Sequence, residues 1–133
     1  MQISSGGSAL HQRTYVIEPQ RFFLPYLETL LTQAGCAVVA MRPTIDERDL
    51  HGHDPALVFF DVDFSENELC SIRSIRAIVP TARIIVYATK ADELFRASCY
   101  IAGANAAISK ADDDQSVIQI VSETAWGGSS RAS

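Results

Sequence analysis

Five short apolar runs alternate with segments of helical periodicity along the chain, and this alternation limits the fold more than any other feature of the sequence. The runs lack the regular polar alternation of a strand with one wet face, so each predicts a strand that is buried on both sides. A chain that repeats strand and helix in this way folds into a parallel sheet with helices on both faces. The sequence therefore predicts an α/β domain with three layers, a doubly wound (βα)5 topology and a central five-stranded parallel sheet. The apolar runs are residues 14–17, 37–40, 56–60, 84–87 and 106–108.

The segments between the runs carry signals for helices and for their ends. Leucines recur at helical spacing within 24–31, and Gly35 is expected to end that helix. Ser65 and Glu68 have the spacing of a capping box, so Ser65 is expected to cap the helix that Pro80 ends. Further helices are predicted at 46–50, at 92–102, and from a cap near 112–114 through 121, and a turn is predicted at 53–55.

Composition limits the class of protein. The chain has 133 residues and is 47% apolar, which suits one domain with a single core. Its formal charge is -5, with 16 acids against 11 bases, and phosphate binding needs a basic patch. We therefore expect no direct nucleic-acid binding and no binding to an anionic membrane. The 3 cysteines are widely spaced, and no apolar stretch reaches about 20 residues, so the sequence predicts a cytoplasmic chain that neither spans a membrane nor is secreted.

The predicted elements also divide the chain. Residues 1–13, with a start rich in Ser and Gly, are expected to form a flexible N-terminal segment. The domain itself is predicted to span residues 14–125. Residues 126–133 are then a C-terminal tail or the start of a linker.

Charged side chains follow several of the predicted strands. Glu18 follows the first strand, Asp61 the third and Lys110 the fifth. Parallel strands place their carboxyl ends at one edge of the sheet, so these side chains should converge. Two or three carboxylates with one ammonium suit a hard cation and a phosphoryl group. The alternative is an ion pair between Lys110 and Asp61 that binds nothing, and spacing does not decide between the two.

Four segments match one known pattern when they are taken together. They are Val16-Ile17-Glu18-Pro19, Leu57-Val58-Phe59-Phe60-Asp61, Ile84-Ile85-Val86-Tyr87-Ala88-Thr89 and Ala102-Gly103-Ala104-Asn105-Ala106-Ala107-Ile108-Ser109-Lys110. Over 14–122 the chain resembles the receiver domains of response regulators, the CheY-like family of two-component signalling. The stretch 117–128 is similar to the last receiver helix and linker of NarL/FixJ-type regulators.

The resemblance implies a flavodoxin or CheY-like fold and a role in bacterial two-component or phosphorelay signal transduction. Asp61 would be the phosphoacceptor, Lys110 would contact the phosphoryl group, and Mg²⁺ would neutralise the transferring oxygens. The implied partners are a histidine kinase or phosphotransfer protein, a downstream protein and a second copy of the chain. No enzyme activity is implied beyond self-phosphorylation of Asp61 from a phosphodonor.

The acidic pair after the first strand departs from the family pattern. Pro19 stands where the family has the carboxylate that binds the metal directly, and Glu18 matches the outer acid. Metal affinity rises with the number of charged ligands, so we expect only a weak Mg²⁺ site, formed by Glu18, Asp61 and Asp63. Asp63 is included because its carboxylate could replace the lost charge. The alternative is that Asp63 is a solvated loop acid.

The positions that report phosphorylation depart further. Ala88 stands where the family has a Ser or Thr, and Ala107 stands where it has an aromatic residue. Thr89 comes one residue late, and a shift of one residue turns a strand side chain to the opposite face. Its hydroxyl can therefore reach the site only if the strand end bulges or the loop folds back. We expect the usual coupling from phosphate to output surface to be weakened.

Three functions are compatible with these observations. The preferred one is an atypical receiver, or pseudo-receiver, that acts through protein-protein contacts with phosphorylation at Asp61 weakened or uncoupled. The second is a conventional phosphoaccepting receiver of a regulator whose DNA-binding output domain is absent from this chain. The third is a small flavodoxin-like ligand-binding or enzymatic domain, which would need a Gly-rich phosphate loop after the first strand. Residues 18–21 do not supply such a loop.

Overall fold

A single parallel sheet forms the centre of the domain in a computed structural model that describes residues 11–126. The sheet has five strands in the order β2-β1-β3-β4-β5, which confirms the predicted doubly wound topology. The strands are β1 (Gln12–Ile17), β2 (Cys36–Arg42), β3 (Leu57–Asp61), β4 (Arg83–Ala88) and β5 (Ala106–Ser109). The helices are η1 (Arg21–Phe23), α2 (Leu24–Gln33), α3 (Glu47–His53), α4 (Glu68–Ile78), α5 (Glu93–Ala102) and α6 (Asp114–Trp126).

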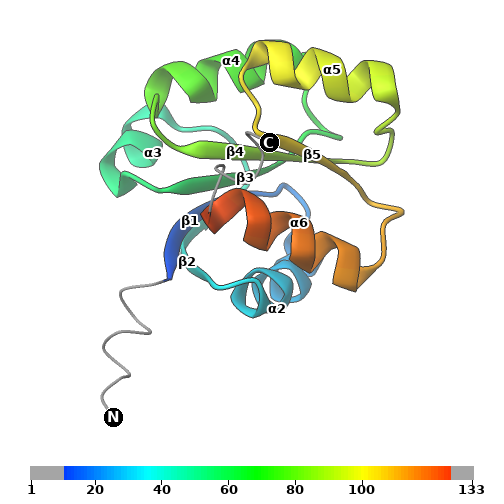
Figure 1. The fold of residues 1–133 in the computed structure, drawn as a ribbon. Helices are drawn as coiled ribbons and strands as arrows, with labels where there is room; N and C mark the ends of the chain where they lie inside the picture. Colours follow the sequence, from blue (N-terminus) through cyan, green and yellow to red (C-terminus); the bar gives the residue numbers. More distant parts are fainter. Residues whose placement is uncertain (1–10, 127–133) are drawn as a thin grey trace.

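The helices cover both faces of the sheet, as the three predicted layers require. Figure 1 shows α2 and α6 on one face and α3, α4 and α5 on the other. The side chains of β3 alternate between these two layers: Leu57 and Phe59 belong to the core under α2 and α6, and Val58 and Phe60 to the other core. Every residue of β3 is buried, including its last residue, Asp61. The central strand β3 therefore places the carboxylate of Asp61 where the carboxyl ends of the parallel strands lie.

The start of α4 differs from the prediction. Asn67 caps this helix, because its side chain accepts a hydrogen bond from the Cys70 N–H at 3.0 Å. The predicted capping box at Ser65 is wrong. A turn closed by the Ser65 N–H and the Val62 carbonyl, 2.9 Å apart, keeps Ser65 outside the helix. The Ser65 hydroxyl lies 2.9 Å from the hydroxyl of Ser71 instead.

Helix α3 is longer than predicted and ends with a left-handed residue. The side chain of Asp46 caps it by accepting from the Asp49 N–H at 3.0 Å, as a predicted start at residue 46 suggests. The helix continues past residue 50 to His53. Asp54 then adopts a positive φ of 46° and reverses the chain, so the turn begins one residue later than predicted.

Arg76 joins the end of α4 to the end of α5. Its guanidinium donates to the carbonyl of Gly103 at 3.2 and 2.7 Å, and to the carbonyls of Pro80 and Ala82 at 2.9 and 2.5 Å. Gly103 has a φ of 125°, which only glycine adopts without strain. One side chain thus connects the loop after α4 to the end of α5.

The predicted terminal segments fall largely outside the described residues. Residues 1–10 of the expected flexible segment 1–13 are outside, and β1 begins at Gln12. Residues 127–133 of the expected tail 126–133 are also outside, and Trp126 is the last residue of α6. Within residues 11–126, no helix has both the length and the apolar character that a membrane crossing needs.

Candidate functional site

The carboxyl ends of the parallel strands bring the predicted acids and the lysine together at one edge of the sheet. Asp61 is the last residue of β3, Glu18 directly follows β1, and Lys110 directly follows β5. Asp61 and Glu18 are 2% and 1% exposed, so both carboxyl groups are shielded from bulk water. Burying a carboxylate is costly unless a partner compensates the charge. The surroundings of each acid must therefore compensate its charge or favour its protonated form.

Lys110 supplies the compensating charge for two carboxylates. Its ammonium Nζ lies 2.7 Å from Oδ2 of Asp61 and 2.7 Å from Oδ2 of Asp63. The other carboxylate oxygen of Asp61, Oδ1, accepts the backbone N–H of Asp63 at 3.0 Å. Burial lowers the pKa of Lys110, but the two carboxylates outweigh that effect and hold the pKa above its ordinary value. The ion pair that the sequence offered as an alternative is present, and it includes a second acid.

Three aromatic rings surround the ammonium of Lys110. Nζ lies 5.4 Å from the ring centroid of Tyr87, 5.6 Å from that of Phe23 and 5.9 Å from that of Phe64. Rings at these distances attract a cation through their negative faces and also exclude water from it. No sequence pattern points to this arrangement, because Phe23 lies in η1, Tyr87 in β4 and Phe64 in the loop after β3.

Among residues 11–126, Glu18 forms no ion pair. Its Oε2 accepts the Gln20 N–H at 2.9 Å, and its Oε1 is buried with no hydrogen-bond partner among the described residues. Burial, followed by the nearby carboxylate of Asp61, raises the pKa of Glu18 to about 8. Burial and the neighbouring carboxylate therefore favour the protonated form of Glu18 over the charged one.

Asp63 binds Thr89 as well as Lys110. The Thr89 hydroxyl donates to Oδ2 of Asp63 at 2.6 Å, and the Thr89 N–H lies 3.0 Å from Oδ1 and 3.3 Å from Oδ2. Thr89 lies beyond the end of β4, so the alternation of a strand no longer dictates where its side chain points. Burial acts to raise the pKa of Asp63, but the hydrogen bonds from Lys110 and Thr89 lower it further and leave it below its ordinary value.

Ala88 and Ala107, which stand where the resemblance would place switch residues, are buried, and the side chain of Arg96 on α5 reaches their neighbourhood. Ala88 is 2% and Ala107 3% exposed. The guanidinium of Arg96 donates to the carbonyl of Ala107 at 2.6 Å and to the carbonyl of Ala91 at 2.8 Å. Arg96 thereby connects α5 to β5 and to the loop before α5. No sequence pattern points to this role, since Arg96 is one of several arginines on helices.

The acids of the site do not assemble into a metal cluster. Within residues 11–126, no group of three or more His, Cys, Asp or Glu side chains is arranged to hold a metal ion. Asp63, which the sequence offered as a replacement ligand, directs its carboxylate to Lys110 and Thr89. Glu18 retains a free oxygen, Oε1, beside Asp61. The residues fit a divalent cation only through Glu18 and Asp61, fewer charged ligands than the sequence predicted.

A small cavity adjoins Asp61. Its volume is about 160 Å³, and apolar side chains form most of its wall. A space of this size has room for water beside Asp61. Its lining residues are Ile17, Pro19, Pro43, Thr44, Ile45, Phe60, Asp61, Phe64, Ser65 and Ser71.

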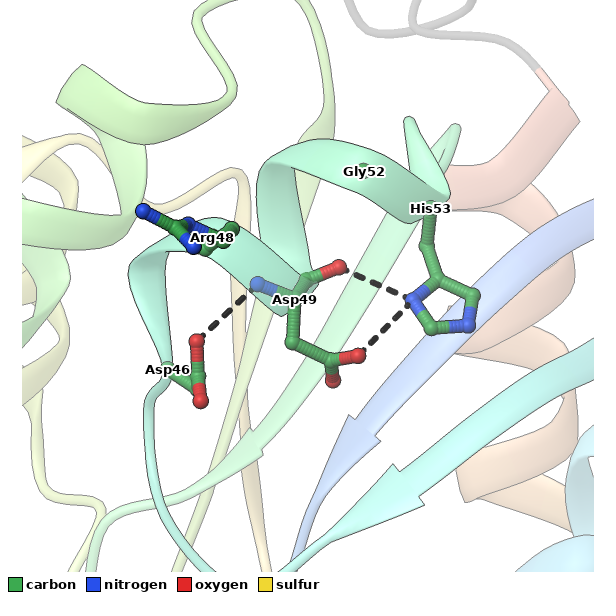
Figure 2. A pocket seen from close by; sticks show the side chains of 5 residues that line it. All are labelled: Asp46, Arg48, Asp49, Gly52 and His53. Carbon is green, nitrogen blue, oxygen red and sulfur yellow. Dashed lines mark hydrogen bonds and ion pairs between the residues drawn. The ribbon is translucent and has the colours of Figure 1, made fainter.

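A second group of charged residues lies on α3, beside a surface pocket of about 390 Å³ (Figure 2). Oδ2 of Asp49 accepts from the Tyr15 hydroxyl at 2.5 Å and from Nε of Arg42 at 2.9 Å. Nδ1 of His53 lies 2.9 Å from the Asp49 carbonyl oxygen and 3.5 Å from Oδ1. The bond from Tyr15 holds the pKa of Asp49 below its ordinary value. These bonds connect α3 to β1 and β2, so the group anchors the helix.

Comparisons with known proteins identify the fold. Neither a protein-family model nor a curated protein matches the chain. A response regulator from Thermotoga maritima matches with a TM-score of 0.75 and 22% identity, over 89% of this chain and 100% of that one. The signal receiver domain of NarL from Mycobacterium tuberculosis matches with a TM-score of 0.70 and 15% identity, over 88% and 98%.

A third structure with the same fold contains a metal. The receiver domain of the sensor histidine kinase PA1611 from Pseudomonas aeruginosa has a magnesium ion coordinated in its active-site cleft. It matches with a TM-score of 0.66 and 18% identity, over 88% of this chain and 99% of that one. The chain thus has the fold of response-regulator receiver domains, which confirms the CheY-like fold expected from the sequence.

Proposed function

We propose that this chain is an atypical receiver domain in two-component or phosphorelay signalling, acting through protein-protein contacts, with phosphorylation at Asp61 weakened or uncoupled from output. One observation carries the proposal. Asp61 ends a buried central strand with Lys110 at 2.7 Å, while Ala88 and Ala107 lie where a receiver would report the phosphate. The acceptor is retained, and the reporting side chains are not.

The retained pair suits phosphoryl transfer. An oxygen of Asp61 would attack the phosphorus of a phosphohistidine or of a small acyl phosphate, and the bond from phosphorus to the donor would break. A carboxylate that attacks an anionic group meets repulsion, which the ammonium of Lys110 reduces. Beyond this transfer to its own Asp61, we propose no enzyme activity. The donor would be a histidine kinase or phosphotransfer protein.

Weak metal binding would limit the reaction. When bound, Mg²⁺ supplies positive charge to the transferring oxygens. Glu18 and Asp61 would hold it, but burial beside Asp61 raises the pKa of Glu18, so a cation must displace a proton there, and Pro19 contributes no side-chain oxygen. Both features reduce the charge available to a cation. Slow phosphorylation of Asp61 follows from this weakness.

A second candidate is a conventional phosphoaccepting receiver whose DNA-binding output domain is absent from this chain. The observation in its favour is the contact between the Thr89 hydroxyl and Asp63 at 2.6 Å, which brings a hydroxyl to the site despite Ala88. Such a receiver would change its contacts with a downstream protein, or with a second copy of itself, when Asp61 is phosphorylated.

The deciding experiment is incubation with acetyl phosphate and Mg²⁺, followed by intact-protein mass spectrometry. A conventional receiver run in parallel sets the conditions, and Asp61→Asn is the matched control. A weakened receiver gains an acid-labile phosphoryl group more slowly than the conventional one, and Asp61→Asn gains none. Labelling at the conventional rate would support the second candidate. Labelling that persists in Asp61→Asn would refute Asp61 as the acceptor.

A further inference from the structure

One carboxylate ties together the loops that follow three strands. Asp63 lies after β3, and its donors lie after β4 and β5: the Thr89 hydroxyl at 2.6 Å, the Thr89 N–H at 3.0 Å and the Lys110 ammonium at 2.7 Å. Hydrogen bonds to an ionised acceptor are shorter and stronger than neutral ones. The side chain of Asp63 is 21% exposed and Thr89 is an exposed residue, so solvent competes for the bonds between them.

These donors form a set that recognises an anion with several oxygens. An ammonium, a hydroxyl and a backbone N–H converge on one point beside Asp61. Any anionic group added to Asp61 would approach the same ammonium, which already contacts Oδ2 of Asp61 at 2.7 Å. The Thr89 and Lys110 donors already bind Asp63, so such a group would compete with the Asp63 carboxylate for them.

The loop that carries Thr89 is held at a second point. The Ala91 carbonyl accepts Nε of Arg96 at 2.8 Å, and the same guanidinium bonds to Ala107 at 2.6 Å. The segment between β4 and α5 is thus attached to the site through Thr89 and to α5 and β5 through Ala91. Neither attachment involves a group that arrives from outside the chain.

The geometry points to Asp63 as a built-in anion that holds the loop between β4 and α5 against the site without a phosphoryl group. The position of this loop at Thr89 is then set by the side chain of Asp63 and is independent of phosphorylation. The inference rests on the proposed function only in naming the phosphoryl group as the anion that Asp63 replaces.

The test measures backbone amide hydrogen exchange by NMR, in buffer without metal or phosphodonor. Asp63→Ala removes the acceptor, and the Thr89 amide should then exchange at least about tenfold faster than in the parent chain. Asp63→Asn keeps an acceptor oxygen but loses the charge, so an intermediate rate is expected. Glu66→Ala, which removes an exposed acid from the same loop, should leave the rate unchanged.

Slow exchange of amides in β3 and β4 shows that each variant is folded, and it separates a local effect from unfolding. If Thr89 exchanges at the parent rate in Asp63→Ala while the β3 and β4 amides remain slow, the inference is wrong. The inference is also wrong if Glu66→Ala speeds exchange of the Thr89 amide as much as Asp63→Ala does. The loss of any negative charge from the loop would then explain the change.

A second arm separates this inference from the proposed function. Mg²⁺ and beryllium fluoride, a phosphoryl analogue, are added to the parent and to Asp63→Ala. Exchange at Thr89 should stay constant in the parent and slow again in Asp63→Ala. A several-fold slowing in the parent would show that the phosphoryl group sets the loop, and would overturn the inference. If beryllium fluoride binds neither protein, the proposed phosphorylation fails while the metal-free comparison still decides the role of Asp63.

Discussion

Asp61 and Lys110 form a shielded ion pair: Nζ and Oδ2 are 2.7 Å apart, and the side chains are 0% and 16% exposed. Forming such a pair costs free energy because both charges lose water. Removing one partner is therefore strongly destabilising, since it leaves the other charge buried without compensation. The two partners are not equivalent here. Lys110 also neutralises Asp63, whereas Asp61 has only this one cation within 4.0 Å among the described residues.

The first prediction uses this asymmetry. Lys110→Ala leaves two carboxylates without a cation and should lower the free energy of unfolding by about 3 kcal/mol. Asp61→Asn should cost clearly less, because Lys110 keeps Asp63. Urea denaturation of both variants measures the difference, and Lys90→Ala, at an exposed lysine nearby, should be neutral. Equal losses for Lys110→Ala and Asp61→Asn would contradict the asymmetry.

The second prediction concerns Glu18 and pH. Its pKa rises from 4.5 to about 8 on folding, so the folded state holds a proton that the unfolded state releases. The stability that this proton contributes is fully present below pH 4.5 and is lost as the pH rises through about 8. Glu18→Gln cannot titrate, so its unfolding free energy should change less over that range. Denaturation at several pH values from 5 to 9, roughly spanning the two pKa values, measures both slopes.

The window for Glu18 is separate from that of Asp63. The folded-state pKa of Asp63 lies below 3.8, so its contribution is present above that pH and is lost only in stronger acid. A parent chain whose stability does not decline toward pH 9, or a Glu18→Gln variant that declines in parallel with it, would argue against a buried protonated Glu18.

The third prediction restores a metal ligand. Pro19→Asp adds a carboxylate next to Glu18, and Mg²⁺ affinity should rise by roughly tenfold or more, because affinity follows the number of charged oxygens. Calorimetric titration with Mg²⁺ measures the change. Gln20→Asp adds the same charge one residue further along the chain. An equal gain in both variants would indicate general attraction of the cation, not coordination at position 19.

The fourth prediction concerns Arg76. Its guanidinium bonds to the carbonyls of Pro80, Ala82 and Gly103, so Arg76→Ala should lower the free energy of unfolding by about 2 to 4 kcal/mol. Arg76→Lys should recover little, because an ammonium cannot reach these separate carbonyls in the fork geometry of a guanidinium. Arg73→Ala, at an exposed position of the same helix, is the control. Similar losses at 73 and 76 would refute the specific role.

Much of the fold could be predicted because it depends on repeated patterns. The apolar runs located every strand, and the parallel topology alone placed Asp61, Glu18 and Lys110 at one edge. The start of α4 was missed because Ser65 and Asn67 are both good caps, and a turn at Ser65 decides between them. Local sequence could not report that turn.

The contacts missed at the site depend on single long side chains and on loops. Arg96 reaches the carbonyl of Ala107, and no periodicity marks such a contact. The position of Thr89 was judged from strand alternation, but Thr89 lies past the end of β4, where alternation no longer applies. Its bond to Asp63 therefore could not be foreseen from the spacing.

The burial of Lys110 among the rings of Tyr87, Phe23 and Phe64 affects how its ion pairs respond to salt. Dissolved ions screen the attraction between exposed charges, and they screen buried pairs much less. The pair of Arg42 and Asp49 on α3, with side chains 42% and 28% exposed, is open to that screening. Concentrated salt would thus loosen the attachment of α3 while the charges at the strand ends stay matched. The strength of the Arg42–Asp49 pair therefore depends on salt concentration, and that of the Lys110–Asp61 pair depends on it much less.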